Sequence, residues 1–233
     1  AVLPVFAVYP MPIQTATETE AVYLFNADTG KTLLTQNADQ PRYVASLTKM
    51  MTALLLLESG KDLNGEVTVP TDLTQEFKDI QNANGTTMGL RIGETVRRID
   101  LLNALLITSA NDAASVIAWD VGGSLNAFIQ QMNARAAELG CTSATFTCAH
   151  GLYDYGNVAS AEDMAKIAAA CAANETFAQV AGSTTYTLGQ TNFHSEQRTI
   201  SSSNPLMDAS GAYYKDSVKW VKGGFTTLAG RCE

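Results

Sequence analysis

Ser46 and Lys49, which stand three positions apart, combine a nucleophile with its base. A serine hydroxyl reacts poorly until a base takes its proton, and lysine is such a base only when it is neutral. In a helix that begins near Ser46, the two side chains share one face. The positive end of that helix lowers a nearby lysine's pKa and offers free N–H groups to an oxyanion. Taken alone, the S-x-x-K pattern is also compatible with two unrelated surface residues.

A second candidate set, Ser109-Ala110-Asn111, falls at a break between two apolar stretches. In a catalytic role the hydroxyl of Ser109 relays protons, and the amide of Asn111 orients Ser46, Lys49 or the substrate. The alternative is structural, because serine and asparagine are frequent N-caps and a helix is expected from Asp112. By itself this segment is better explained as a cap.

A third set, Lys222-Gly223-Gly224, follows the apolar residues of 217–221, which we expect to form a strand. Glycines allow another backbone to come close to a strand edge, and the lysine places a cation where a carboxylate could dock. The alternative is a strand that simply ends in a turn.

The elements that would position these residues follow from apolar periodicity and turn signals. The middle of 46–59 is apolar all round, which indicates a buried helix, and residues 62–69 form a short strand or loop. Strands around these helices at both chain ends predict a sheet built from both ends, with a helical region inserted between them. The expected elements are a hairpin of 21–25 and 31–35, helices 46–59, 100–106, 112–120, 125–139 and 160–172, and strands 184–188 and 217–221.

Composition excludes several classes of protein. The 233-residue chain is 46% hydrophobic and only 16% charged, so it has the composition of a folded domain. A net charge of −8 argues against nucleic-acid binding, and no apolar run approaches the ~18 residues of a membrane-spanning helix. Residues 1–20 begin with ten uncharged residues, which fit a leader or the remnant of an export signal.

Four cysteines leave two alternatives open. Cys141 and Cys148 enclose only six residues, so a local disulfide is compatible with the sequence. The other alternative is four buried thiols that behave as small hydrophobic side chains. Without a C-x-x-C or a closely spaced His–Cys set, we expect no zinc site.

The three sets together, in this order, resemble the signature of penicillin-binding proteins and class A β-lactamases. The resemblance is closer to the low-molecular-mass D-alanyl-D-alanine carboxypeptidases, serine peptidase family S11, and extends from about residue 20 to the last residue. The stretches that carry it are 45–53 (ASLTKMMTA), 105–114 (LLITSANDAA), 149–152 (AHGL), 160–165 (SAEDMA) and 222–226 (KGGFT).

The resemblance implies an α+β, β-lactamase/transpeptidase-like domain over residues 21–233 and a role for each motif residue. Ser46 would be the acylated nucleophile, Lys49 its base, and Ser109 and Asn111 the second motif. Lys222 would attract the substrate's terminal carboxylate and polarise Ser109. The expected substrate-binding strand comprises Gly223, Gly224, Phe225 and Thr226, with the N–H groups of Ser46 and Phe225 as the oxyanion hole. His150 is expected to be structural.

The same resemblance implies a partner and a location. The substrate would be a peptidoglycan stem peptide that ends in D-Ala-D-Ala, and β-lactam antibiotics would acylate the same serine outside the cytoplasm. No metal or organic cofactor is implied, because serine and lysine supply nucleophile and base. Carboxypeptidase, endopeptidase and transpeptidase activities differ only in the amine that leaves or enters, and the sequence does not separate them.

Three departures from the family pattern keep alternatives open. The second motif contains Ala110 instead of glycine or aspartate, and Gly223 replaces a threonine that would contact substrate. The chain ends at Glu233, where the family continues into further strands, so we expect missing C-terminal strands and an unpaired edge open to another chain. A weak penicillin-binding or sensor domain therefore remains an alternative. A β-lactamase is disfavoured, because Glu162, Glu175 and Glu196 lack a Glu-x-x-Leu-Asn setting.

Overall fold

The structure, a computed structural model, describes residues 18–152 and 156–233. The expected leader, residues 1–20, lies almost entirely outside the described residues. The α-helices are α1 (Thr48–Glu58), α2 (Thr74–Asn82), α3 (Arg98–Ile107), α4 (Asn111–Gly122), α5 (Leu125–Glu138), α6 (Ala161–Ala172) and α7 (Glu175–Ala181). The strands are β1 (Val22–Phe25), β2 (Thr32–Gln36), β3 (Arg42–Tyr43), β4 (Glu66–Thr68), β5 (Thr95–Arg97), β6 (Val158–Ala159), β7 (Thr185–Leu188), β8 (Arg198–Ser201), β9 (Gly224–Thr226) and β10 (Gly230–Cys232).

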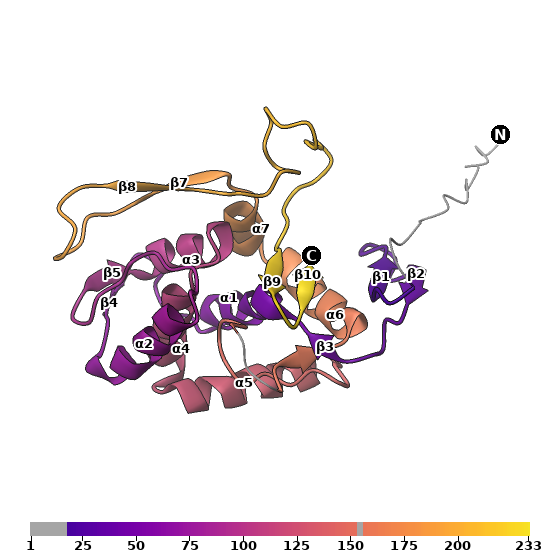
Figure 1. Cartoon of the computed structure of the whole chain (residues 1–233), viewed down its shortest axis with the longest axis horizontal. Helices are drawn as coiled ribbons and strands as arrows, with labels where there is room; N and C mark the ends of the chain where they lie inside the picture. The colour runs from indigo at the N-terminus through magenta and orange to yellow at the C-terminus, as the bar shows by residue number, and fades with distance from the viewer. Residues whose placement is uncertain (1–17, 153–155) are drawn as a thin grey trace.

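Helix α1 forms the centre of the core, as its uniformly apolar sequence predicts. It packs against α3, α4, α5, α6 and α7, which surround it in Figure 1. Met51, Ala53 and Leu56 are completely buried. A helix enclosed on every side needs no polar face. Accordingly, every residue from 48 to 56 except Leu55 is buried. None of the described helices is long and apolar enough to cross a membrane.

The ends of the helices follow local sequence signals. Ser160 caps α6 by accepting a hydrogen bond from the N–H of Asp163, which confirms the expected S-x-x-D start. Ser124 caps α5 in the same way. Helix α4 is followed by the capping residue Gly123, whose φ of +73° is the left-handed conformation that glycine adopts without a steric penalty.

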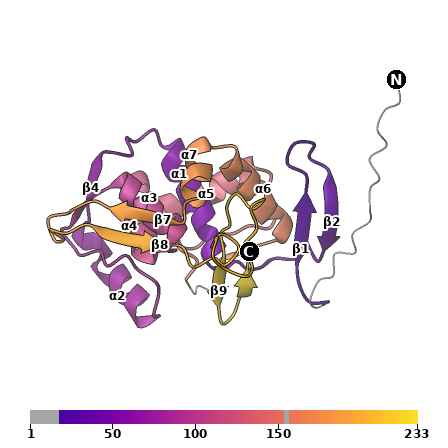
Figure 2. The ribbon, with the colours of Figure 1, turned by 90° about the horizontal axis from the view of Figure 1, so that it is seen from above.

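The described strands form five two-stranded antiparallel sheets, and one of these pairs, β3–β6 with Arg42 opposite Ala159, joins segments far apart in the sequence. The expected hairpin is confirmed as β1 and β2, with Val22 opposite Gln36, and it lies against α6 at one end of the molecule (Figures 1 and 2). Strands β9 and β10 lie beside the start of α1 instead. The fold class is the expected one, but one detail differs: among the described strands no single sheet joins the two chain ends. A short turn connects the strands of each terminal hairpin, so β1 pairs with β2 and β9 with β10 rather than with the other end of the chain.

The strand expected at Ser217–Val221 is not present. This segment contains a turn in which the N–H of Val218 bonds to Lys215, and the strand begins only at Gly224. Trp220 packs edge-to-face on Phe177 of α7, with 5.2 Å between ring centroids. That contact, not strand pairing, fixes the segment.

The strand edge that we expected to be unpaired also has a partner within the chain. Strand β9 pairs with β10 through Gly224–Cys232, Phe225–Arg231 and Thr226–Gly230. The expected association of this edge with another chain is therefore not required for its pairing.

The four cysteines are free thiols, so the Cys141–Cys148 disulfide is not formed. Cys171 is fully buried in the core and directs its thiol at the carbonyl of Met50 (3.5 Å). Only this cysteine is buried as a small hydrophobic side chain would be, since the other three are partly exposed.

Candidate active site

The nucleophile candidate lies in a short 3-10 helix, Ala45–Leu47, that runs directly into α1. Ala45 has a φ of +45°, a conformation that is uncommon for a residue with a side chain and recurs at functional sites. One turn further on, Lys49 Nζ lies 3.0 Å from Ser46 Oγ. The two side chains thus share one face of the helix, as their spacing predicts.

Lys49 is completely buried and has no acidic partner among the ion pairs of the described residues. Besides Ser46, its amine donates to Asn111 Oδ1 (2.8 Å) and to the carbonyl of His150 (2.6 Å). Burial, followed by the positive charge of Lys222, holds the pKa of Lys49 well below its usual value. The lysine can therefore become neutral and accept the proton of Ser46.

The second motif does not cap a helix. Helix α4 begins at Asn111, and its N-cap position is Ala110, which makes no side-chain capping bond. Ser109 has a φ of +60° and directs its hydroxyl to Lys222, while Asn111 faces Lys49. The capping alternative is therefore wrong.

The orientation of Asn111 is fixed from both sides. Its Nδ2 donates to the carbonyl of Thr86 (2.9 Å), which leaves Oδ1 to accept from Lys49. The neighbouring Asp112 accepts hydrogen bonds from the backbone N–H groups of Met88, Gly89 and Leu90 at 2.9–3.0 Å. This buried carboxylate anchors the loop that holds Asn111, a contact that sequence patterns do not disclose.

Lys222 is a second buried cation, 6% exposed. Its amine donates to Ser109 Oγ (3.1 Å) and to the carbonyl of Gly223 (2.6 Å), and it takes part in none of the ion pairs of the described residues. Burial lowers its pKa to about 8. A buried lysine without a counter-charge is suited to attract an anionic ligand.

The glycines of the third motif have different surroundings. A Cβ on Gly224 would lie 2.7 Å from Ser46 N and 3.1 Å from the Cβ of Ala45. Strand β9 can therefore lie against the nucleophile's turn only with glycine at this position. A Cβ on Gly223 would lie 3.6 Å from the carbonyl oxygen of Cys232 and 3.9 Å from Glu233 Cγ, both ordinary contacts.

The last two residues predicted for substrate binding lie less directly at this site. The side chain of Phe225 is 69% exposed, although its backbone is part of β9 beside Ser46. Thr226 Oγ1 accepts the N–H of Ala229 (3.0 Å) within the β9–β10 turn. The structure therefore does not bring the Thr226 hydroxyl to Lys222.

The segment around His150 completes the site through its backbone. The carbonyl of His150 accepts from Lys49, and Gly151, with a φ of +72°, packs so tightly that a Cβ would overlap the carbonyl of Ala45. The segment 149–152 is one of the stretches that carry the resemblance to the family. Its residue types, however, do not indicate that a backbone carbonyl binds Lys49. Within the described part of the chain, no group of His, Cys, Asp or Glu side chains is arranged to hold a metal ion.

The site combines a serine and an unpaired lysine at a helix start with a Ser-x-Asn motif and a lysine–glycine strand. This combination defines the serine penicillin-binding class. The sequence profile of peptidase S11, D-alanyl-D-alanine carboxypeptidase, matches residues 10–232. The chain belongs to this family.

Relatives agree with that assignment. D-alanyl-D-alanine carboxypeptidase DacF of Bacillus subtilis is 33% identical over 66% of this chain and 39% of its own length. A D-alanyl-D-alanine endopeptidase of Escherichia coli is 28% identical over 90% of this chain and 64% of its own length. The chain thus spans less than two thirds of these curated relatives.

Solved structures show the same fold. The D,D-transpeptidase of Streptomyces K15 matches with a TM-score of 0.78 and 30% identity over 90% of this chain and 80% of that one. A D-alanyl-D-alanine carboxypeptidase of Mycobacterium tuberculosis matches with a TM-score of 0.77 and 26% identity over 90% of this chain and 74% of that one. The expected β-lactamase/transpeptidase-like fold is confirmed.

Proposed function

We propose that residues 21–233 form a serine D-Ala-D-Ala carboxypeptidase that removes the terminal D-Ala from peptidoglycan stem peptides. The observation that carries this proposal is the buried amine of Lys49, which lies 3.0 Å from Ser46 Oγ and forms no ion pair with any acidic side chain that the structure describes. Only a lysine that is readily neutral can serve as the base for serine.

The first half of the proposed reaction forms an acyl-enzyme. Neutral Lys49 takes the proton of Ser46, and Ser46 Oγ attacks the carbonyl carbon of the penultimate D-Ala. The backbone N–H groups of Ser46 and Phe225 stabilise the oxyanion. Lys222 binds the terminal carboxylate and holds Ser109, which relays the proton from Lys49 to the leaving amine and leaves Lys49 neutral. The C–N bond breaks and D-Ala departs.

In the second half, water attacks the ester, and Lys49 again removes the proton. The ester bond breaks, the shortened peptide leaves, and the proton returns to Ser46 Oγ. No cofactor takes part. The same chemistry opens a β-lactam ring and leaves the drug on Ser46. Because stem peptides lie outside the cytoplasm, the protein acts there, either secreted or facing the cell wall.

Incubation with penicillin is expected to add one drug molecule to the protein, and Ser46→Ala is expected to abolish the adduct. Intact-mass measurement reads this directly, and peptide mapping locates the site. An adduct that persists in Ser46→Ala would contradict the assignment of the nucleophile. A D-Ala-D-Ala peptide should lose one D-Ala with the wild-type protein and none with the variant.

The reaction products distinguish the proposed carboxypeptidase from the alternative functions. Penicillin labelling without release of D-Ala would identify a binding or sensor domain, and rapid turnover of penicillin would identify a β-lactamase. Cleavage of a cross-linked dimer, or transfer to an added amine, would show the endopeptidase or transpeptidase activity after which several relatives are named.

Gly223→Thr is expected to raise kcat/KM for D-Ala-D-Ala peptides several-fold. Threonine restores a hydroxyl beside Lys222, and one charge-assisted hydrogen bond is worth about 1.5–3 kcal/mol. Its Cβ would make only ordinary contacts, the nearest at 3.6 Å, so the variant should fold. Steady-state kinetics with circular dichroism as a folding control tests this. Unchanged or lower activity in a folded variant would favour the sensor alternative.

A further inference from the structure

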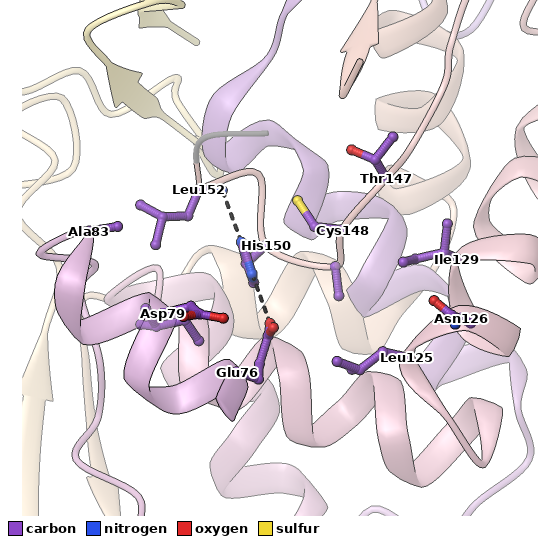
Figure 3. A pocket seen from close by; sticks show the side chains of 12 residues that line it. Glu76, Asp79, Ala83, Leu125, Asn126, Ile129, Thr147, Cys148, His150 and Leu152 are labelled. Carbon is purple, nitrogen blue, oxygen red and sulfur yellow. Dashed lines mark hydrogen bonds and ion pairs between the residues drawn. The ribbon is translucent and has the colours of Figure 1, made fainter. Parts of the chain in front are cut away.

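A pocket of about 460 Å³ is formed by α2, the start of α5 and residues 147–152 (Figure 3). The side chains of the three candidate catalytic sets, 46–49, 109–111 and 222–224, do not line it, but the segment of His150, whose carbonyl accepts from Lys49, forms part of its wall. Its described lining includes the carboxylates of Glu76 and Asp79 but no lysine or arginine. The pocket therefore favours uncharged or cationic molecules over anions.

One wall of this pocket carries a cysteine, a histidine and a glutamate. His150 Nε2 lies 3.0 Å from Glu76 Oε1, which also accepts the hydroxyl of Ser115 (2.8 Å). The carboxylate keeps a proton on Nε2, so Nδ1 is the acceptor, and the backbone N–H of Leu152 points at it (2.9 Å). Cys148 lines the same pocket, two residues before His150. Glu76 stabilises a positive charge on the ring of His150, and this charge favours the thiolate form of Cys148.

The surroundings of Cys148 also favour the thiolate. Gly151 N–H donates to its Sγ at 3.2 Å. Burial raises the pKa of the thiol, but the neighbouring His150 and the N–H of Gly151 outweigh burial and leave the pKa below its usual value. Burial instead raises the pKa of Cys141 to about 11 and also raises that of Cys232. Because the thiolate is the reactive form, Cys148 is the most reactive of these thiols.

The segment that carries Cys148 also holds the catalytic lysine. The carbonyl of Ala149 accepts from Thr52 Oγ1 and that of His150 from Lys49 Nζ, both at 2.6 Å. Gly151 is packed against Ala45. A group attached to Cys148 would displace the Gly151 N–H and, with it, the carbonyl that positions Lys49.

We propose that this pocket is a thiol–disulfide exchange site, in which a small disulfide without negative charge modifies Cys148 and thereby stops acylation of Ser46. The Cys148 sulfur attacks one sulfur of the disulfide, a mixed disulfide forms, and the original S–S bond breaks. The other half leaves as a thiolate and takes up a proton from solvent, which replaces the proton that Cys148 released on ionising. The effect on Ser46 rests on the proposed function, whereas the exchange itself does not.

The test compares cystamine, a cationic disulfide, with dithiodiglycolate, an anionic one, on the full chain. Peptide mapping should find one cysteamine on Cys148, formed at least about tenfold faster than any adduct from dithiodiglycolate. Penicillin labelling of Ser46 should fall at least about tenfold in the modified protein and return after reduction with dithiothreitol. Cys148→Ser should resist cystamine and still be labelled by penicillin.

Glu76→Gln provides the matched control for the cluster. Glutamine keeps the size of the side chain but removes the charge that stabilises the imidazolium, so modification of Cys148 should slow and the preference for cystamine should shrink. Adducts spread over the other cysteines, equal rates for the two disulfides, or full penicillin labelling of the Cys148 adduct would each overturn the proposal. If penicillin does not label the unmodified protein, the proposed function is wrong. Peptide mapping would still test whether Cys148 exchanges with the disulfide.

Discussion

Replacing Lys49 with arginine is expected to slow acylation of Ser46 by about 10³-fold, within the range that a general base contributes. Arginine keeps a positive charge in the site but does not lose its proton in proteins, so it cannot accept the proton of Ser46. The rate of penicillin labelling, followed by intact mass, measures the loss. Labelling within tenfold of wild type would show that another group is the base.

The pH dependence of the wild-type protein follows from the same two lysines. Lys49 works only when neutral, and its pKa is held well below its usual value by burial and by Lys222. The rate should therefore rise with pH well below the usual pKa of lysine. Lys222 must be charged to attract a carboxylate, and its pKa is about 8. The value of kcat/KM should consequently fall again above about pH 8. A rising limb that survives in Lys49→Arg would contradict this assignment.

Gly224→Ala is expected to reduce acylation at least about 10²-fold, because a Cβ there would lie 2.7 Å from Ser46 N. Either β9 or the nucleophile's turn must shift, and both carry an N–H group of the proposed oxyanion hole, where one donor is worth about 10²–10³-fold. The matched control is Gly223→Ala, one position earlier, where the nearest atom is 3.6 Å away.

Gly223→Ala should remain within about threefold of wild type. Penicillin labelling rates of the two variants, with thermal unfolding as a check on folding, separate the local clash from general damage. Equal rates for Gly224→Ala and Gly223→Ala would show that the close approach of β9 to Ser46 is not required.

Sequence alone predicts those contacts of the site that join residues of the same helix. Ser46 and Lys49 meet because residues three apart in a helix share a face. The contacts of Asn111 with Lys49 and of Lys222 with Ser109 span 62 and 113 residues. No periodicity predicts such contacts, and only the resemblance to the family indicated them.

The elements that sequence patterns missed are short or mostly exposed. Helix α2 buries only Ile80 fully, and α7 is seven residues long. Strand β8 has the sequence Arg-Thr-Ile-Ser, with no fully buried residue to produce an apolar alternation. Such segments are ordered by their neighbours, as Glu76 of α2 is by His150 and Ser115.

The two buried lysines also affect the stability of the fold. For Lys222, a pKa of about 8 instead of 10.5 means that the protonated side chain costs about 3 kcal/mol of folding free energy at neutral pH. Between these pH values the unfolded chain binds the additional proton, so stability increases as pH rises. A bound carboxylate would offset the same cost. The charged Lys222 therefore lowers the stability of the ligand-free domain at neutral pH, and binding of a carboxylate at this lysine raises it.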